Sequence, residues 1–198
     1  MRIVAGRFGG RRIAPPPTDA TRPMLDRVRE ALFSTLGEAV DGAQVLDLYS
    51  GTGSLGLEAL SRGASFVRFV ERDAATRRVL AENVALLDVG GEAEVLVGDA
   101  LAVRARETPA RFLEPEGGAD AARWVDLALI DPPYPHWKEL AQRKAILATL
   151  EDLLARRARP GATLVLHTHP RDVAERELRF AASAEARDYN NSRLWYLR

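Results

Sequence analysis

The sequence predicts an α/β protein built on one mostly parallel sheet of seven strands with helices on both faces. Three observations support this fold class. From residue 44 onward, short apolar runs alternate with longer stretches whose apolar residues recur at helical spacing. Helices between strands imply the right-handed crossovers that connect parallel neighbours. Acidic residues and glycines follow several of the strands, where open α/β sheets bind ligands.

The strands and helices of this sheet follow one another in a regular order. Strands are expected at 45–48, 66–70, 93–97, 124–130, 163–167, 177–182 and 193–197. Helices are expected at 55–61, 74–87 and 138–157. The stretch 102–123 contains prolines and glycines and is expected to be a long loop.

A small basic extension is expected ahead of this domain, so that the chain divides into residues 1–41 and 42–198. The extension combines a β-hairpin with a helix. Its expected parts are strands at 2–6 and 11–14 around Gly9-Gly10, a proline connector at 15–17, and a helix at 24–36 that stops at Gly37. Arginines are concentrated in this region although the net charge of the chain is +0.

Bulk composition narrows the class of protein. A length of 198 residues fits one domain with at most a small appendage, and 46% hydrophobic content suffices for a packed core. No apolar run approaches the roughly 20 residues that cross a bilayer, and the start lacks the apolar stretch of a signal peptide. Without cysteine there are no disulfides or thiolate metal sites. We expect a cytoplasmic monomer without a bound metal.

A glycine-rich turn follows the first strand of the sheet. Gly51-Thr52-Gly53-Ser54-Leu55-Gly56 matches G-x-G-x-x-G, and Glu71 lies about twenty residues further on, where a ribose-binding acid belongs. Read alone, this pattern also fits a nicotinamide dinucleotide. However, Asp47 precedes the turn in the form Asp-x-x-x-Gly-x-Gly, and a carboxylate there would repel a pyrophosphate. The pattern favours a cofactor with a cationic ammonium and a sulfonium, such as S-adenosylmethionine.

A further acid follows the third strand. Asp99 could accept a hydrogen bond from the amino group of an adenine, or it could cap the element that follows it. Asp47, Gly51, Glu71 and Asp99 thus stand at successive strand ends, which form one edge of a parallel sheet. This order favours a ligand site over isolated capping residues.

The motif Asp131-Pro132-Pro133-Tyr134 directly follows the apolar fourth strand and is the most specific signal in the chain. Two prolines fix φ and withhold backbone donors, so the turn presents carbonyl groups. The Asp131 side chain and the Pro132 carbonyl could accept both hydrogens of an exocyclic amine, while Tyr134 stacks on the base. The alternative is a rigid turn in which Asp131 caps and Tyr134 packs.

With both motifs placed, the chain resembles those class I methyltransferases that carry the motif (Asp/Asn)-Pro-Pro-(Tyr/Phe), which have a Rossmann-like fold. More narrowly, it resembles the bacterial 16S rRNA guanine-N2 methyltransferase family over nearly the whole chain. The segment Asp26-Arg27-Val28-Arg29-Glu30-Ala31-Leu32-Phe33 is the specific part, because other Pro-Pro-Tyr enzymes lack it. The other segments that carry the resemblance are 2–6, 10–13, 22–23, 47–53, 57–64 and 131–134.

The resemblance implies methylation of a guanine N2 amine in small-subunit rRNA, with S-adenosylmethionine as cofactor. It also implies that the RNA is presented to the enzyme during ribosome assembly, within a ribosomal particle. The implied cofactor residues are Asp47, Tyr49, Ser50, Gly51, Gly53, Glu71, Arg72, Asp99 and Ala100. The implied catalytic residues are Asp131, Pro132, Pro133 and Tyr134. Candidates for RNA contact are Arg7, Arg11, Arg12 and Arg22. One departure is Met24-Leu25, where the family usually has two hydroxyl residues.

Two other functions share parts of this pattern. An adenine-N6 DNA methyltransferase would share the tetrapeptide but would normally need a target-recognition domain, for which the chain has little room. A non-enzymatic RNA-binding or ribosome-assembly factor would keep the fold without turnover, and the intact tetrapeptide argues against it. His167 and His169 are interpreted as polar loop residues near the cleft, and His136 is a weaker candidate for the base pocket.

Overall fold

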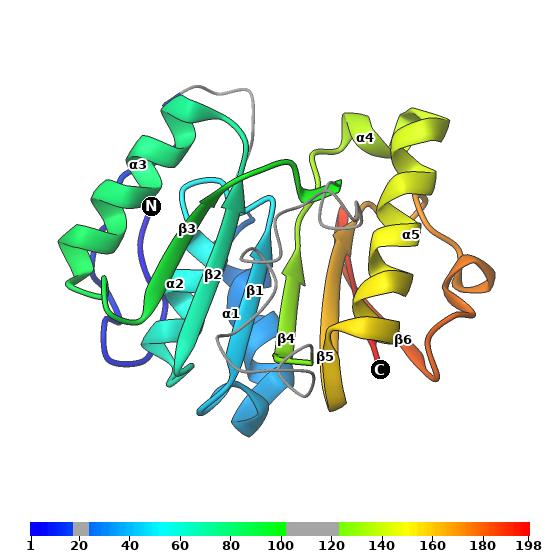
Figure 1. The fold of residues 1–198 in the computed structure, drawn as a ribbon, viewed down its shortest axis with the longest axis horizontal. Coiled ribbons are helices and arrows are strands. Elements are labelled where there is room, and N and C mark those ends of the chain that lie inside the picture. Colours follow the sequence, from blue (N-terminus) through cyan, green and yellow to red (C-terminus); the bar gives the residue numbers. More distant parts are fainter. Residues whose placement is uncertain (18–23, 102–122) are drawn as a thin grey trace.

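The structure is a computed structural model that describes residues 1–17, 24–101 and 123–198. These residues form a seven-stranded sheet flanked by helices (Figure 1). The strands are β1 Gln44–Leu48, β2 Phe66–Glu71, β3 Ala93–Val97, β4 Val125–Ile130, β5 Ala158–Thr168, β6 Ala184–Tyr189 and β7 Ser192–Leu197. The helices are α1 Asp26–Leu36, α2 Ser54–Ser61, α3 Ala74–Leu87, α4 Pro135–Lys138 and α5 Leu140–Arg156, with 3-10 turns η1 Gly37–Val40 and η5 Glu175–Leu178.

The strand order in the sheet is β3-β2-β1-β4-β5-β7-β6. The first five of these strands run parallel, and β7 runs antiparallel to both β5 and β6. β2 and β3 extend the sheet on one side of β1, whereas β4 and β5 extend it on the other. The direction in which strands are added to the sheet therefore reverses between β1 and β4, although the two strands run parallel. Ligands in open α/β sheets bind at the carboxyl ends of the strands at such a switch point.

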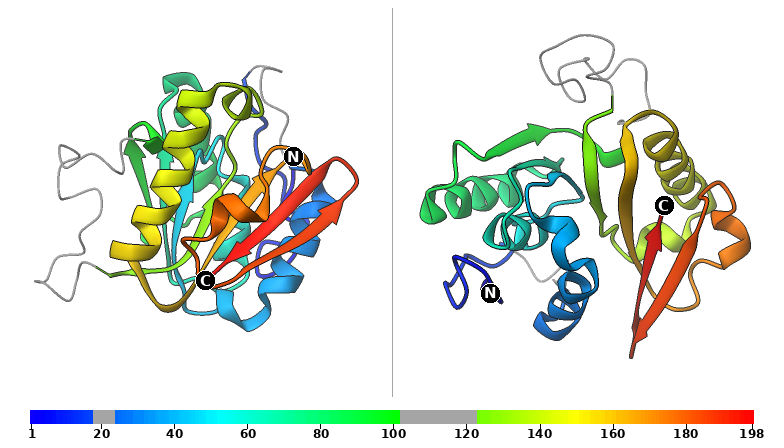
Figure 2. Two further views of the ribbon diagram at one scale, coloured as in Figure 1. Left: turned by 90° about the vertical axis from the view of Figure 1, so that its right-hand side faces the viewer. Right: turned by 90° about the horizontal axis from the view of Figure 1, so that it is seen from below.

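Two hydrophobic cores lie on the two faces of the sheet (Figures 1 and 2). Alternate residues of β1 separate them: Val45 belongs to the core that contains α1, α2 and α3, whereas Leu46 and Leu48 belong to the core that contains α4 and α5. The N-terminal segment joins the first core through Ile3 and Ile13. The mostly parallel sheet with helices on both faces is confirmed, while the division at residue 42 stays a prediction.

The prediction of a strand at 177–182 is wrong. This segment instead overlaps the 3-10 turn η5, and the sixth strand, β6, begins only at Ala184. The Glu177 carboxylate explains the turn, since it accepts a hydrogen bond from the Ala174 N–H at 3.0 Å and from Arg143 of α5 at 2.5 Å. A side chain that bonds its own backbone three residues back favours a helical turn over a strand.

Other boundaries differ locally from those expected. The N-terminal hairpin is reduced to an isolated antiparallel bridge between Arg2 and Arg12, flanked by a few backbone hydrogen bonds. The helix expected at 138–157 is α5, preceded by the separate short helix α4, and β5 begins five residues earlier than expected, at Ala158. Among the described residues, no helix is long and apolar enough to cross a membrane.

Candidate functional site

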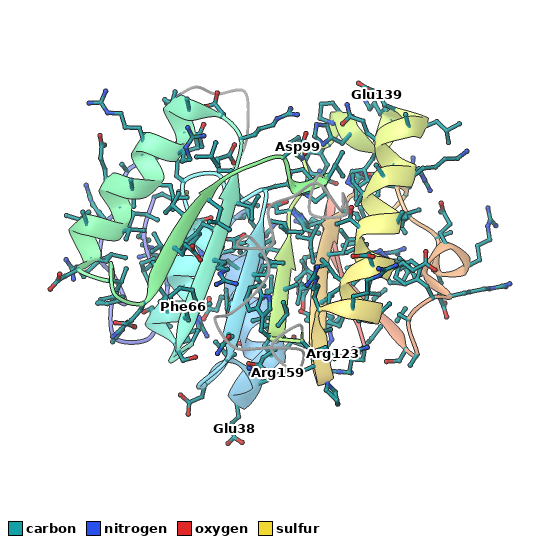
Figure 3. The ribbon with its side chains drawn as sticks, viewed as in Figure 1. Glu38, Phe66, Asp99, Arg123, Glu139 and Arg159 are labelled. Carbon is teal, nitrogen blue, oxygen red and sulfur yellow. The ribbon has the colours of Figure 1, made fainter. Side chains whose placement is uncertain are left out.

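The site expected from the motifs lies at the carboxyl ends of β1 to β4. Figure 3 shows Asp99, which follows β3, and Glu139, which follows α4, at the end of the molecule opposite to Glu38 and Arg159. The electrostatics agree that the strand ends lie close together, because the charges of both Glu71 and Asp131 raise the pKa of Asp47. The expected acids after β1, β2 and β4 therefore meet at one edge.

Asp47 is almost fully buried, at 1% exposure, and faces the start of α2. One of its oxygens accepts a hydrogen bond from the Gly56 N–H at 2.9 Å. This N–H is one of the donors that the first turn of a helix leaves unpaired, so Asp47 ties β1 to α2. Burial raises the pKa of Asp47 well above its ordinary value. The Gly56 N–H opposes that shift, and the carboxylates of Asp131 and Glu71 add to it.

The glycines of the turn have a steric reason. Gly53 has φ 86°, and a Cβ there would lie 2.4 Å from a methyl carbon of Leu80. Gly51 also has a positive φ, of 56°, and its N–H donates to Glu71 at 2.9 Å. Ser50 is buried, and its hydroxyl accepts a hydrogen bond from the Val70 N–H at 2.8 Å. Ser50 therefore connects the turn to β2, which is a structural task beside the cofactor contact expected for it.

Glu71 and Asp99 both bond to nearby backbone as well as facing the site edge. The two Glu71 oxygens accept from the Gly51 N–H at 2.9 Å and the Asp73 N–H at 2.8 Å. Asp99 accepts from the Leu101 N–H at 2.9 Å, so the capping interpretation holds for one of its oxygens. Its other oxygen lies 3.5 Å from the Arg72 guanidinium, in a solvent-exposed pair. The neighbouring Ala100 is buried.

The partly buried ring of Tyr49 and the buried ring of His136 meet between the glycine-rich turn and α4. Tyr49 has φ 59°, an uncommon value for a tyrosine, and its ring meets His136 edge to face with 5.9 Å between centroids. The Tyr49 hydroxyl and His136 Nδ1 are buried without a hydrogen-bond partner in the described part of the chain. Burial raises the pKa of Tyr49, to which the charge of Asp99 adds. Burial and then Arg72 lower the pKa of His136. His136 thus lies beside the turn rather than beside Tyr134.

The tetrapeptide forms a turn between β4 and α4. The Pro133 carbonyl accepts a hydrogen bond from the His136 N–H at 2.9 Å, whereas no backbone N–H within the described ranges donates to the Pro132 carbonyl. Pro132 is buried, and the Tyr134 side chain is 45% exposed at the rim. The turn therefore leaves the carbonyl that was expected to bind an amine, and a tyrosine ring, available to a ligand.

His167 contacts this turn, which the sequence interpretation missed. Its Nδ1 lies 2.7 Å from Asp131 Oδ1, and its ring meets Tyr134 edge to face at 6.0 Å. Burial lowers the pKa of His167, but the charge of Asp131 and the hydrogen bond outweigh it, so the pKa lies above its ordinary value. The sequence carries no signal for this contact, because it follows from the parallel pairing of Ile130 with Leu166, which brings the next residue of each strand alongside the other.

Two of the arginines expected to bind RNA lie away from the site edge. Arg7 pairs with Glu92, just before β3, and Arg11 donates to the Leu86 carbonyl at 2.7 Å, in the last turn of α3. Because α3 runs away from the site edge for 14 residues, or about 21 Å, both lie near the opposite edge. Arg12 is exposed, and Arg22 lies outside the described residues. Their role in RNA contact stays a prediction.

A buried ion pair explains the helix motif at 26–33. Arg29 of α1 and Glu58 of α2 are both 0% exposed, with 3.6 Å between guanidinium and carboxylate. Glu58 accepts from the backbone N–H groups of Val4 and Ala5 at 2.6 and 3.0 Å, and Arg29 donates to the Arg2 carbonyl at 2.6 Å. Burial lowers the pKa of Arg29, although Glu58 and Asp26 oppose that shift. The pair fixes the N-terminal segment against α2.

Comparisons with known proteins agree with this fold. The family model described as "Conserved hypothetical protein 95" matches residues 1–198. Ribosomal RNA small subunit methyltransferase D of Escherichia coli is 40% identical over 134 residues, which are 68% of this chain and 60% of that protein. The putative rRNA methyltransferase YlbH of Bacillus subtilis is 33% identical over 156 residues, 77% of this chain and 74% of that protein.

Solved structures give the same result. The putative methyltransferase yhhF from Escherichia coli superposes with a TM-score of 0.72 at 28% identity, covering 100% of this chain and 97% of that chain. The alignment with the Escherichia coli methyltransferase D nevertheless spans only about three fifths of that relative, 60% of its length. The match over all 198 residues, and the likeness of sequence and fold, show that the chain belongs to the "Conserved hypothetical protein 95" family, which has the class I methyltransferase fold.

Proposed function

We propose that this protein transfers a methyl group from S-adenosylmethionine to the exocyclic N2 amine of a guanine in small-subunit ribosomal RNA. The observation that carries the proposal is the position of Asp131. It follows β4 at the switch point of the sheet, beside the glycine turn of β1, with one oxygen held by His167. Within the described ranges its second oxygen accepts no hydrogen bond.

The residues beside the turn fit a cationic cofactor. Glu71 and Asp131 both lie close enough to Asp47 to act on its charge, and three acids gathered at this edge disfavour a pyrophosphate. Gly53 leaves no room for a side chain, so the backbone there can approach a ligand closely. The Tyr49 hydroxyl and His136 Nδ1, which have no hydrogen-bond partner among the described residues, would offer polar contacts beside Asp99 and Arg72, where the adenine end would lie. When bound, S-adenosylmethionine supplies an electrophilic methyl group.

Asp47 acts on this cofactor indirectly. Its carboxylate is buried and bonded to the Gly56 N–H, so it holds the turn and the start of α2 in place. Gly51, Glu71 and Asp99 would contact the cofactor directly, at the methionine end, the ribose and the adenine in that order. The carboxylates of Glu71 and Asp99 keep unused acceptor capacity, because each carboxylate oxygen can accept two hydrogen bonds.

The tetrapeptide would hold the target base. One Asp131 oxygen and the Pro132 carbonyl accept the two hydrogens of the amine, which directs the nitrogen lone pair at the methyl group. The nitrogen held by Asp131 and Pro132 would receive the methyl group while the sulfur leaves as a neutral thioether, and the Asp131 carboxylate would be the neighbouring acceptor for the proton that the nitrogen loses. Positioning supplies much of the rate. Stacking on Tyr134 contributes about 1–3 kcal/mol once the base has left its own stack.

One relative named as a ribosomal RNA small subunit methyltransferase and another named as a putative rRNA methyltransferase support the RNA substrate. The guanine N2 position rests on the family resemblance of the motifs at 26–33 and 131–134. A ribosomal particle as substrate, a cytoplasmic location and a monomeric state belong to the same proposal. So does a role of Arg7, Arg11, Arg12 and Arg22 in binding the RNA backbone.

The test uses the purified protein, methyl-labelled S-adenosylmethionine and small-subunit particles that lack the modification. The RNA is digested and the labelled nucleosides are identified, with Asp131→Ala as the parallel variant. We expect label in N2-methylguanosine that is lost in the variant. Label in N6-methyladenine of added DNA would instead support the DNA methyltransferase, and cofactor binding without transfer to any acceptor would support a non-enzymatic factor.

A further inference from the structure

We propose that His167 is a positioning residue for methyl transfer: it holds one oxygen of Asp131, leaves the other for the target amine, and supports the ring of Tyr134. This inference rests on the proposed function, since it assigns a task within the same site. It adds a residue from β5 to a site whose other expected members all follow β1 to β4.

The contact with Asp131 is set by the sheet itself. Parallel pairing of β4 with β5 runs in register up to Ile130 and Leu166, so the next residue on each strand is brought alongside its neighbour. The His167 Nδ1 and Asp131 Oδ1 atoms are 2.7 Å apart, and the His167 side chain is 7% exposed. Because an ionised carboxylate can only accept, Nδ1 carries the hydrogen. Two rigid strands therefore fix the direction in which the Asp131 carboxylate points.

The same ring also contacts the other end of the tetrapeptide. The His167 and Tyr134 rings meet at 63° with centroids 6.0 Å apart, an edge-to-face geometry that is favourable for aromatic pairs. The two prolines between Asp131 and Tyr134 limit the backbone, and His167 limits the side chains at both ends. One residue thus sets the acceptor of the amine and the stacking ring relative to each other.

A purely structural role explains the observations less well. His167 Nε2 is buried without a hydrogen-bond partner in the described part of the chain. Leaving a buried polar atom unpaired costs about 1–3 kcal/mol, which an apolar residue at the end of β5 would avoid. Buried polar groups that are only partly satisfied are found at functional sites, where they direct neighbouring groups. The cost is consistent with selection for the contact with Asp131.

The charged and titratable groups around His167 come from four segments. Asp131 ends β4, and Tyr134 follows it in the turn. From β7, Arg193 pairs in the sheet with Thr168 but is itself bound to Asp188. Asp172 lies in the loop that follows β5 and influences Tyr134. Asp131 is the group that bonds to His167 directly, and its charge keeps the imidazole protonated to a higher pH than usual.

Protonation of His167 should therefore weaken the site. An imidazolium neutralises the negative charge of Asp131, which then accepts a hydrogen bond and a proton from the amine less well. The neutral imidazole still donates through Nδ1 but leaves the carboxylate charge uncompensated. We expect kcat to rise with pH as His167 loses its proton, above the ordinary histidine range.

Three variants separate positioning from packing. His167→Asn keeps an N–H donor near the place of Nδ1, His167→Leu fills the volume without a donor, and His169→Gln is the matched control two residues away. The control residue bonds only within its own loop. We measure kcat and KM for the RNA, S-adenosylmethionine affinity by calorimetry, and the thermal midpoint of each variant.

We expect His167→Leu to lower kcat by about 10²-fold, as small misplacements of reacting groups do, with cofactor affinity within about 3-fold of wild type. His167→Asn should recover most of kcat and lose the low-pH decline. His169→Gln should match wild type in both. A folded His167→Leu variant with wild-type kcat would overturn the inference. If that variant does not fold, a low-pH decline retained in His167→Asn would overturn it instead.

A second readout does not depend on activity. The His167 imidazole is titrated by NMR in the wild type and in Asp131→Asn, and the pKa should fall in the variant because the neighbouring charge is gone. An unchanged titration would refute the pairing. Wild-type transfer of label to an amine other than guanine N2 would refute the proposed substrate, while the kcat comparison of the His167 variants on that amine would still decide the role of His167.

Discussion

Glu58 and Asp131 show two ways in which this molecule uses a carboxylate. Glu58, on α2, is fully buried and accepts hydrogen bonds from two backbone N–H groups and from Arg62, with Arg29 close by. Asp131, after β4, is 28% exposed and has one oxygen bound to His167. In the described part of the chain its other oxygen has no donor.

The difference separates structural acids from reactive ones. A carboxylate whose acceptor sites are filled by the fold gains stability and has no capacity left for a ligand. A carboxylate held by one oxygen is oriented but can still bind. Asp47 is intermediate, because it is almost as buried as Glu58 but, among the described residues, accepts a hydrogen bond from the Gly56 N–H alone. The contrast predicts that changes at these positions will separate stability from activity.

The largest effect on stability is expected at Glu58. Glu58→Ala removes one partner of the buried ion pair with Arg29 and takes the acceptor away from two backbone N–H groups, so the free energy of unfolding should fall by about 3–5 kcal/mol. Urea denaturation measures the change. Asp152→Ala is the control, since its pair with Arg156 lies on the surface and should contribute about 0–1 kcal/mol. Equal effects at both positions would contradict the structural assignment of Glu58.

The opposite pattern is expected at Asp131. Asp131→Ala should lower kcat for RNA methylation by about 10²-fold or more, because the amine loses its oriented acceptor. Its thermal midpoint should change far less than that of Glu58→Ala. A single-turnover methyl-transfer assay and a melting curve on the same preparation check both. A large loss of stability with residual activity intact would break the comparison.

A smaller loss of stability is expected where Asp47 meets α2. A Cβ at Gly56 would lie 2.3 Å from a ring carbon of Phe69, in a tightly packed part of the sheet face. Gly56→Ala should therefore cost about 1–3 kcal/mol of unfolding free energy. It should also weaken S-adenosylmethionine binding, because the turn that Asp47 holds must shift. Gly90→Ala, where a Cβ meets nothing within 4 Å, is the matched control.

The smallest effect is a pH dependence of stability from the His167–Asp131 pair. The pKa of His167 is raised in the folded protein, so this group adds stability that is fully present below its unfolded pKa of about 6.5. That contribution is lost as the pH rises through the folded pKa. Thermal midpoints measured across this range should show a decline in the wild type that His167→Asn lacks. Identical profiles would show that the pair does not titrate as inferred.

Much of the fold followed from local patterns. The strands at 66–70 and 93–97 and the helix at 74–87 match β2, β3 and α3 because each has an unbroken apolar pattern and a clear boundary. The strand expected at 177–182 failed because the Glu177 carboxylate bonds the Ala174 backbone and Arg143 of a distant helix. The latter contact has no signature in the local sequence.

The candidate site was predictable where it depends on strand ends. The acids after β1, β2 and β4 were expected to meet, and the parallel order of the strands brings them together. His167 was not assigned to the site, because the sequence does not state which strand lies beside β4. The arginines at 7 and 11 show the converse. Their clustering in sequence indicated a basic surface, but Glu92 and a carbonyl of α3 bind them.

The sequence by itself determined the class of fold, the glycine turn and the tetrapeptide, because backbone constraints of glycine and proline and the periodicity of apolar residues act over a few positions. Only the tertiary structure decided which polar groups pair. Asp131 with His167, Glu58 with Arg29, and Asp47 with Gly56 are joined by the register of neighbouring strands and the packing of helices. Such contacts between distant residues depend on the whole fold, and they determine which carboxylates are filled and which remain free to act.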